Sequence, residues 1–144
     1  MIGKGSVLGI DIDIKKHNKI AIEKHHLSKR ITLIQGSSID DQVVKKVKTI
    51  AKTKKRIMLF LDSNHTHEHV LKELELYSSL IKKGSYVIVF DTIINDIPNN
   101  WWSKHLSPRP WNKKNNPKSA VKEFLLKNNR FKIDYTIENK ILLT

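Results

Sequence analysis

Acidic and histidine side chains are concentrated in one short stretch, residues 62–69 (DSNHTHEH), which directly follows an apolar run. A further acid, Asp91, ends the next apolar run along the chain, and Thr92 comes after it. If the two runs are neighbouring parallel strands, Asp62 and Asp91 project into one crevice, where with Thr92 they offer the oxygen ligands that Mg²⁺ prefers. His65 is the histidine closest to the strand end, which makes it the candidate general base beside Asp62. The spacing therefore predicts a divalent-metal or acid–base site.

The histidine spacing argues against zinc. His65 and His69 are four positions apart, as in the His-Glu-x-x-His arrangement, but Glu68 directly precedes His69 and the alternating histidines match no such motif. The chain has no Cys, so thiolate ligands, Cys nucleophiles and disulfides are excluded. The alternative interpretation of the stretch is a polar helix start, in which His67 and His69 are structural. The amide oxygen of Asn64 is an alternative to a hydroxyl as the neutral metal ligand.

Small polar and acidic residues also follow the first two apolar runs. An acid at a strand end, here Asp11 or Asp13, can hold the two hydroxyls of a ribose, and its alternative role is to cap the next helix. Gly36, Ser37 and Ser38 could lie against an adenine, because a residue without a bulky side chain lets a flat ring approach the backbone. Helix capping is again the alternative. A nucleotide-cofactor site and ordinary helix caps both stay open here.

The elements that must position these residues alternate along the chain. Short apolar runs bounded by polar or turn residues predict buried parallel strands at 6–11, 31–34, 57–61 and 85–90. Apolar residues at helical spacing predict helices over 15–27, 38–50, 67–81 and 116–128. This alternation is typical of right-handed βαβ units. It predicts an α/β protein with a Rossmann-like, mostly parallel sheet that has helices on both faces.

The helix ends and the end of the chain give further expectations. Ser38 is the expected N-cap of the second helix, and Gly84 the residue that follows the end of the third. Residues 131–144 alternate apolar and polar and contain a turn signal at Glu138-Asn139, which predicts a C-terminal antiparallel hairpin.

A long segment between the fourth strand and the last helix has little periodicity. It contains all three tryptophans, Trp101, Trp102 and Trp111, together with three of the four prolines. Loops of this length inside a compact domain are commonly functional. We expect the segment to form a lid or a wall of the substrate site.

The composition bounds the class of protein. A chain of 144 residues with 39% hydrophobic and 28% charged residues is typical of one globular domain, and no apolar run is long enough to span a bilayer. The net charge of +13 comes from 23 Lys and 4 Arg against 14 acids and is spread along the whole chain. Nucleic-acid readers usually concentrate Arg and aromatic residues on one face, so nucleic acid is not the expected partner. The absence of Cys is compatible with the cytoplasm, where we expect the protein to be located.

Four blocks of sequence together resemble the cephalosporin hydroxylase family, also described as rhamnosyl O-methyltransferase-like. The blocks are VLGIDIDIKKHN, ITLIQGSSID, LDSNHTHEHVLKELELYSSLIKKGSYVIVFDT and RPWNKKNNPKSAVKEFL, and they occur in order over almost the whole chain. The resemblance implies a class I S-adenosylmethionine-dependent methyltransferase fold, whose sheet ends in an antiparallel hairpin. In similar enzymes an acid after the second strand holds the cofactor ribose, which here implies Asp11 with Asp13 next to it. Acids after the fourth and fifth strands hold a divalent metal, which here implies Asp62 and Asp91.

The chain departs from this family at its start. The family's first strand, its glycine-rich cofactor loop and the next helix should precede Val7, where the chain has only MIGKGS. Residues 1–144 therefore resemble a single domain that corresponds to the C-terminal two-thirds of the family's catalytic domain. Loss of the central strand would expose a sheet edge, through which a homo-oligomer could form.

The sequence thus predicts an S-adenosylmethionine-dependent O-methyltransferase, or a fragment inactivated by truncation, acting on a hydroxyl of a sugar or small metabolite. In this interpretation Asp62, Asp91 and Thr92 hold Mg²⁺, while Asp11, Asp13, Ser37 and Ser38 contact the cofactor, and His65 and Asp62 are the catalytic residues. The alternative is a non-catalytic Rossmann-like binding module or partner subunit that uses the same surface.

Overall fold

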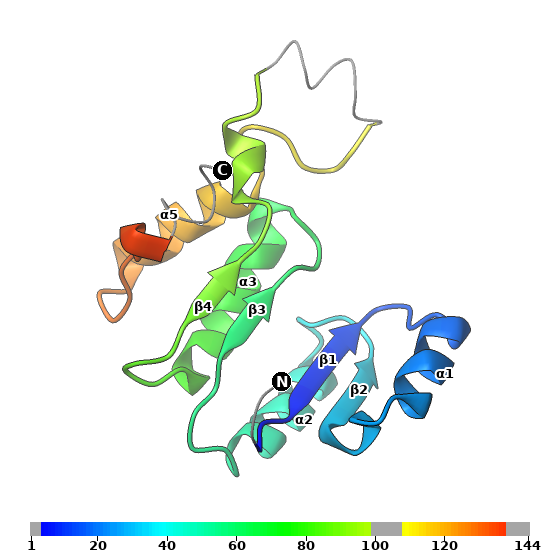
Figure 1. Cartoon of the computed structure of the whole chain (residues 1–144). Helices are drawn as coiled ribbons and strands as arrows, with labels where there is room; N and C mark the ends of the chain where they lie inside the picture. The colour runs from blue at the N-terminus through cyan, green and yellow to red at the C-terminus, as the bar shows by residue number, and fades with distance from the viewer. Residues whose placement is uncertain (1–3, 99–107, 138–144) are drawn as a thin grey trace.

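The computed structural model describes residues 4–98 and 108–137, in which strands and helices alternate along the chain (Figure 1). The strands are β1 (Val7–Asp11), β2 (Ile31–Gln35), β3 (Leu59–Leu61) and β4 (Val87–Val89). The helices are α1 (Lys16–Lys24), α2 (Asp41–Ala51), α3 (His67–Tyr77) and α5 (Pro117–Lys127), with 3-10 turns η1 (Ser28–Arg30), η2 (Ser78–Leu80) and η3 (Thr92–Asn95). The predicted α/β class is confirmed.

The strands pair in parallel but form two separate sheets. β1 pairs with β2 from Val7↔Ile31 to Asp11↔Gln35, and β3 pairs with β4 from Leu59↔Val87 to Leu61↔Val89. Within the described residues no strand of one pair is hydrogen-bonded to a strand of the other. Figure 1 shows the four strands pointing the same way, with β1 and β3 as the two that face each other across the break. The single continuous sheet that the alternation predicted is therefore not present in this part of the chain.

Two hydrophobic clusters join the helices to the strands. Val43, Val44 and Val47 of α2 pack with Tyr77 of α3 against side chains from β1, β2 and β3. Val70 and Leu74 of α3 pack with Ala120 and Phe124 of α5 against Leu61, with further contacts from β4. Helices α2, α3 and α5 therefore form one layer that spans both strand pairs, because each apolar helix face is covered by the inward side chains of the strands.

The helix ends differ from the expectations at two positions. The N-cap of α2 is Asp40, not Ser38, because the Asp40 Oδ1 accepts hydrogen bonds from the N–H groups of Gln42 (2.9 Å) and Val43 (3.2 Å). Ser38 instead uses its hydroxyl in a contact with another helix. α3 ends at Tyr77 and η2 follows it, so Gly84 is not its C-terminal cap. Gly84 has a φ of 83° in the turn before β4.

The predicted C-terminal hairpin is wrong in its first strand. Residues 131–134 have no regular structure and residues 135–137 are helical. The cause is local, because Asp134 Oδ1 accepts hydrogen bonds from the N–H groups of Thr136 (3.2 Å) and Ile137 (3.4 Å), which starts a helical turn. The expected second strand, residues 138–144, lies outside the described residues.

None of the helices in the described ranges combines the length and apolar character needed to cross a membrane.

Candidate functional site

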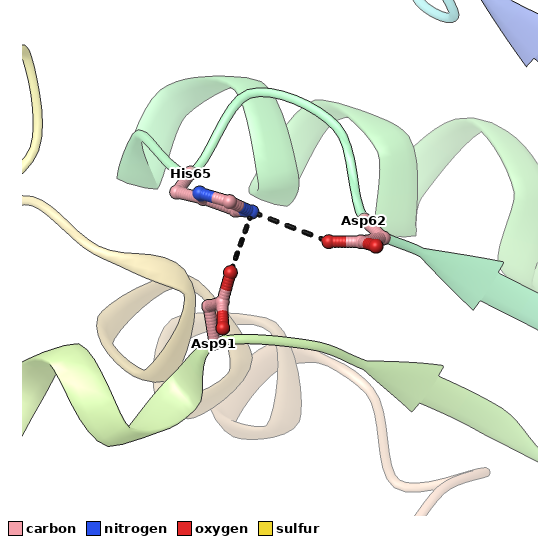
Figure 2. Close-up of side chains that lie close together, drawn as sticks. All are labelled: Asp62, His65 and Asp91. Atoms are coloured by element: carbon pink, nitrogen blue, oxygen red, sulfur yellow. Dashed lines mark hydrogen bonds and ion pairs between the residues drawn. The ribbon is translucent and has the colours of Figure 1, made fainter.

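Three side chains from the ends of β3 and β4 converge on one point (Figure 2). Asp62 directly follows β3, His65 lies in the loop that leads into α3, and Asp91 comes shortly after β4. The Nε2 atom of His65 lies 3.4 Å from Asp62 Oδ1 and 3.1 Å from Asp91 Oδ2. One ligand atom from each residue lies within 4.8 Å of the other two. The parallel pairing of β3 with β4 explains this, since the carboxyl ends of neighbouring parallel strands meet at one edge of the sheet.

The backbone of Asp91 is unusual. It has a φ of 53° and a ψ of 26°, and within the described residues it is the one non-glycine residue with a positive φ. Asp is among the few non-glycine residues that enter this left-handed region, and such residues are common at functional sites. The next residue, Thr92, opens η3, and the buried side chain of Ile94 anchors that turn. The predicted metal-ligand residues Asp91 and Thr92 are therefore held at a sharp bend directly after the strand.

An aromatic residue from the long loop lies against His65. The rings of His65 and Trp111 have centroids 5.0 Å apart and meet edge to face at 78°. The guanidinium carbon of Arg109 lies 5.3 Å from the centre of the Trp111 ring. The His65 side chain, against which Trp111 packs, is 17% exposed, whereas the Asp62 side chain is 62% exposed. Of the three tryptophans expected near the substrate, Trp101 and Trp102 lie outside the described residues.

The loop that carries Trp111 is tied to the start of α3. Asn115 Oδ1 accepts a hydrogen bond from the N–H of His67 (2.7 Å), and its amide group donates to the carbonyl of Pro110 (2.8 Å). The fully buried Asn116 caps α5 with a hydrogen bond from the N–H of Ser119 (3.0 Å). The side-chain amides of Asn115 and Asn116 therefore fix the loop so that Trp111 lies beside the Asp62–His65–Asp91 cluster.

His67 joins α3 to α5 and takes no part in the three-residue cluster. Its Nδ1 lies 2.8 Å from Ser119 Oγ and its Nε2 lies 2.9 Å from Glu123 Oε2. A hydrogen bond from Lys127, and to a smaller extent one from His67, holds the pKa of Glu123 below its usual value. The structural interpretation of His67 is therefore the one that its contacts support.

The candidate cofactor residues lie together at the ends of β1 and β2. Asp11 Oδ1 accepts a hydrogen bond from the N–H of Asp13 (2.9 Å), and the Asp11 carbonyl accepts one from the N–H of Gly36 (2.9 Å). Asp13 forms an ion pair with Lys15, whose pKa is raised by this contact. Ser37 follows Gly36, and its carbonyl accepts the N–H of Asp40 (3.0 Å). The two loops are thus side by side, as a shared ligand would require.

Gly36 is required at its position by both backbone and space. Its φ is 150°, and a Cβ atom there would lie 2.8 Å from Cγ2 of the buried Val43. Most L-residues avoid this φ, and the contact is closer than van der Waals packing allows. The glycine was expected to admit a flat ring, but in the structure it admits the side chain of α2.

A buried carboxylate connects the two groups of strand ends. Glu73 is 2% exposed, and its Oε1 accepts hydrogen bonds from Ser38 Oγ (2.5 Å) and Ser63 Oγ (2.8 Å). His69 Nε2 lies 3.0 Å from Ser38 Oγ and 3.6 Å from Glu73 Oε1. The other oxygen, Oε2, is buried with no hydrogen-bond partner among the described residues. Because Ser63 is next to Asp62, Glu73 links the loop after β2 to the candidate metal site.

Sequence reasoning missed Glu73, although the chain contains a signal for it. Position 73 lies three residues after Val70 and four before Tyr77, both of which are buried on the inner face of α3. A Glu on such a stripe is rarely buried unless it has partners. The partner Ser38 lies 35 positions away in the sequence, so local pattern could not identify it.

The donor set of the cluster fits a divalent metal ion. Two carboxylates and one imidazole, each offering an atom to a common point, suit Mg²⁺ or Mn²⁺ with water in the remaining positions. The structure therefore brings the predicted ligands Asp62 and Asp91 together and adds His65, which the sequence assigned to proton transfer. Thr92 stays a predicted ligand beside them.

Comparison with known proteins adds the family. A model of the Rhamnosyl O-methyltransferase/CmcI family matches residues 1–144. Proteins named rhamnosyl O-methyltransferase, from Mycobacterium tuberculosis (strain ATCC 25618 / H37Rv) and Mycobacterium bovis (strain BCG / Pasteur 1173P2), are each 30% identical over 69 residues. The aligned stretch covers 47% of this chain but 28% of each relative, so less than a third of those proteins is matched. No solved structure matches the chain significantly.

Proposed function

Because the chain belongs to the rhamnosyl O-methyltransferase/CmcI family, we propose that it forms all or part of an S-adenosylmethionine-dependent O-methyltransferase that a divalent metal assists. The observation that carries this proposal is the convergence of Asp62, His65 and Asp91 at the carboxyl ends of β3 and β4. The acceptor in this proposal is a hydroxyl of a sugar or another small metabolite, and the name of the relatives, rhamnosyl O-methyltransferase, favours a sugar. Residues 1–144 act as a single domain in this proposal.

Each of the three side chains contributes one atom to the metal site. These are Oδ1 of Asp62, Nε2 of His65 and Oδ2 of Asp91, with the hydroxyl of Thr92 as a further oxygen ligand. When bound there, the metal would lower the pKa of the acceptor hydroxyl and orient it. One imidazole nitrogen cannot bind a metal and accept a proton at the same time. We therefore assign His65 to the ligand set, and proton acceptance to Oδ2 of the more exposed Asp62, the carboxylate oxygen that is not assigned to the metal.

The acceptor sits beside Trp111 in this proposal. The indole ring borders the cluster through its contact with His65, and a flat apolar ring suits the apolar face of a sugar. Methyl transfer from a sulfonium to an oxygen is helped mainly by alignment of the reacting atoms and by removal of the hydroxyl proton. The protein's contribution is thus the fixed position of Asp62 and Asp91, which the strand ends and the Glu73 network supply.

In this proposal the ends of β1 and β2 would hold the cofactor, which would supply the methyl group when bound. Asp11 is the residue proposed to bind the ribose, with Asp13 beside it, and the backbone near Ser37 and Ser38 borders the adenine. The adjacency of the two loops supports this placement. The hydroxyl of Ser38 is already donated to Glu73, so its contribution to the cofactor would come from its main chain.

The test is a calorimetric titration of the full chain with MnCl₂. Removal of one charged ligand, in Asp62→Asn or Asp91→Asn, is expected to weaken Mn²⁺ binding at least about tenfold. The matched control is Asp41→Asn, since Asp41 is an acid in the first turn of α2 that has no place in the cluster. Equal Mn²⁺ affinity in all four proteins would refute the metal site. A second titration with S-adenosylmethionine, lost in Asp11→Ala, tests the cofactor site separately.

One observation favours a second candidate function, a non-catalytic binding module. The parallel sheet is split, and β1 and β3 each have an edge without a strand partner in the described part of the chain. Unpaired strand edges are sites where other polypeptides bind. A folded chain that binds neither Mn²⁺ nor S-adenosylmethionine would support this function over the enzymatic one.

A further inference from the structure

The side chain of Arg109 lies over the face of Trp111, next to the candidate metal site. Its guanidinium carbon is 5.3 Å from the centre of the indole ring, and that ring has its centroid 5.0 Å from the centroid of the His65 ring. One aromatic ring therefore separates the guanidinium from the imidazole, whose Nε2 lies beside Asp62 and Asp91. Arg109 is exposed, and the side chains of the two aspartates are 62% and 49% exposed. A ligand at this surface can therefore touch the cluster and the guanidinium at the same time.

Arg109 makes different contacts from the arginines that brace the fold. Arg30 Nε donates to the carbonyl of Gly5 (2.5 Å), and Arg130 Nη2 donates to the carbonyl of Ile81 (3.1 Å). Within the described ranges the Arg109 side chain makes no ion pair or hydrogen bond, and its partner is the face of an indole ring. A guanidinium carries five N–H donors in a planar fork, and stacking on an aromatic ring leaves these donors unused. The donors of Arg109 are therefore available to bind a ligand.

The backbone that carries Arg109 is restricted before any ligand binds. Arg109 lies between Pro108 and Pro110, so it precedes a proline, which limits it to extended conformations. The carbonyl of Pro110 accepts a hydrogen bond from the side-chain amide of Asn115 (2.8 Å), and Asn115 Oδ1 in turn accepts one from the N–H of His67 (2.7 Å). The loop is thus tied to the start of α3, which also follows the metal site. A side chain on a fixed loop loses less conformational freedom on binding, and this favours a role in recognition.

The charges of the loop and of the cluster favour an anionic ligand. Residues 108–116 contain Arg109, Lys113 and Lys114 and no acidic residue. The neighbouring Asp62 and Asp91 carry two negative charges, which one divalent ion would neutralise when bound. The positive charge of the loop is then not balanced by the site itself. A negative group on the ligand would balance it.

We propose that Arg109 binds a carboxylate on the acceptor, so that the acceptor is an acidic sugar of the uronic acid class. This inference rests on the proposed function, because it places the acceptor hydroxyl at the metal. The planar fork of a guanidinium matches a carboxylate with two parallel hydrogen bonds. Because one aromatic ring separates the guanidinium from His65, the ligand must carry its hydroxyl and its carboxylate about one sugar ring apart. This arrangement also keeps the ligand carboxylate away from Asp62 and Asp91.

The test is a calorimetric titration of the full chain, loaded with MnCl₂, with pairs of glycosides. Methyl glucuronoside is compared with methyl glucoside, and methyl galacturonoside with methyl galactoside, because the members of each pair differ only in the carboxylate. We expect at least one uronoside to bind at least about tenfold more tightly than its neutral counterpart, since hydrogen bonds to a charged group are the strong ones. Glucose 6-phosphate is the third probe and carries a phosphate in place of the carboxylate.

Variants of Arg109 assign the preference to one side chain. Arg109→Gln should abolish the preference for the uronoside, and Arg109→Lys should restore only part of it, because Lys keeps the charge but not the fork. The matched control is Arg56→Gln, which removes the same charge from an exposed arginine that precedes β3, whereas the site follows β3. It should keep the full preference. Mn²⁺ affinity should stay within about threefold in all these variants, since salt screens charges at this separation.

The outcomes separate this inference from the proposed function. A chain that does not bind Mn²⁺ would refute both. Mn²⁺ binding with equal affinity for acidic and neutral glycosides, or with no binding of either, would refute the acidic acceptor alone. An equal loss of preference in Arg56→Gln would mean that net charge, not Arg109, attracts the uronoside. Tighter binding of glucose 6-phosphate than of every uronoside would replace the carboxylate by a phosphate and overturn the assignment.

Discussion

Glu73 provides the sharpest test of how the two strand-end loops are held together. Its Oε1 atom accepts hydrogen bonds from Ser38 (2.5 Å) and Ser63 (2.8 Å) in a position where the side chain is 2% exposed. Hydrogen bonds to a charged group contribute about 1.5–3 kcal/mol each. Glu73→Ala removes both of them, leaves the Ser63 hydroxyl without the acceptor that it has here and opens a cavity. It also relieves the cost of burying the carboxylate, so we expect a net loss of about 3–5 kcal/mol in the free energy of unfolding.

Glu73→Gln separates the acceptor atom from the charge. Gln keeps an oxygen that both serine hydroxyls can reach and places its amide group where Oε2 has no partner in the described structure. The expected loss is therefore smaller, about 1–2 kcal/mol. Ser85→Ala is the matched control, because the hydroxyl of Ser85 is buried without a hydrogen-bond partner in the described ranges. It should leave the free energy of unfolding within about 0.5 kcal/mol of the parent value.

Urea unfolding followed by circular dichroism measures all three variants on one scale. The reasoning is refuted if Glu73→Ala is within about 1 kcal/mol of the parent chain, or if Ser85→Ala costs as much as Glu73→Ala. Mn²⁺ titration of the folded Glu73→Gln protein extends the test to the site. Ser63 is adjacent to Asp62, so a loosened Ser63 should weaken Mn²⁺ binding, whereas a purely structural role would lower stability without changing the affinity.

Three further predictions concern other parts of the chain. Burial and the nearby Glu73 raise the pKa of Tyr77 to about 12. The stability that the protonated Tyr77 hydroxyl contributes is therefore complete below pH 10 and is lost as the pH rises through 12. Tyr77→Phe should remove the ionisation step near pH 12 from an ultraviolet titration. Phe124→Ala should lower the free energy of unfolding by about 3–5 kcal/mol because it empties the α3–α5 core, while Leu126→Ala on the exposed face of that helix should change it by less than about 0.5 kcal/mol. Gly36→Ala should cost about 1–3 kcal/mol through the contact with Val43, whereas Gly5→Ala, with only an ordinary contact to Arg30, should be close to neutral in thermal unfolding.

The parts of the fold that depend on local pattern could be predicted, and those that depend on distant contacts could not. Runs such as 31–34 and helical spacing such as that of α3 are local, and both elements begin at the residues that the sequence predicted, although α3 ends earlier than expected. Residues 131–137 alternate as a strand would, but the side chain of Asp134 starts a helical turn there instead. The meeting of Asp62 with Asp91 was inferred from the rule that parallel strand ends converge. The pairing of Ser38 with Glu73 follows no local rule and required the structure.

The division of the strand layer separates the two chemical tasks of the proposed enzyme. Every ligand of the candidate metal site follows β3 or β4, and these strands form a complete unit with α3 and α5. The candidate cofactor residues follow β1 and β2, which meet that unit through the helix layer and through the contacts of Ser38 with Glu73, His69 and Tyr77. Metal binding should therefore not require the break to be filled, because no ligand crosses it. Methyl transfer additionally requires the cofactor and the metal to be aligned across the break, so it depends on the contacts that Ser38 makes with Glu73, His69 and Tyr77.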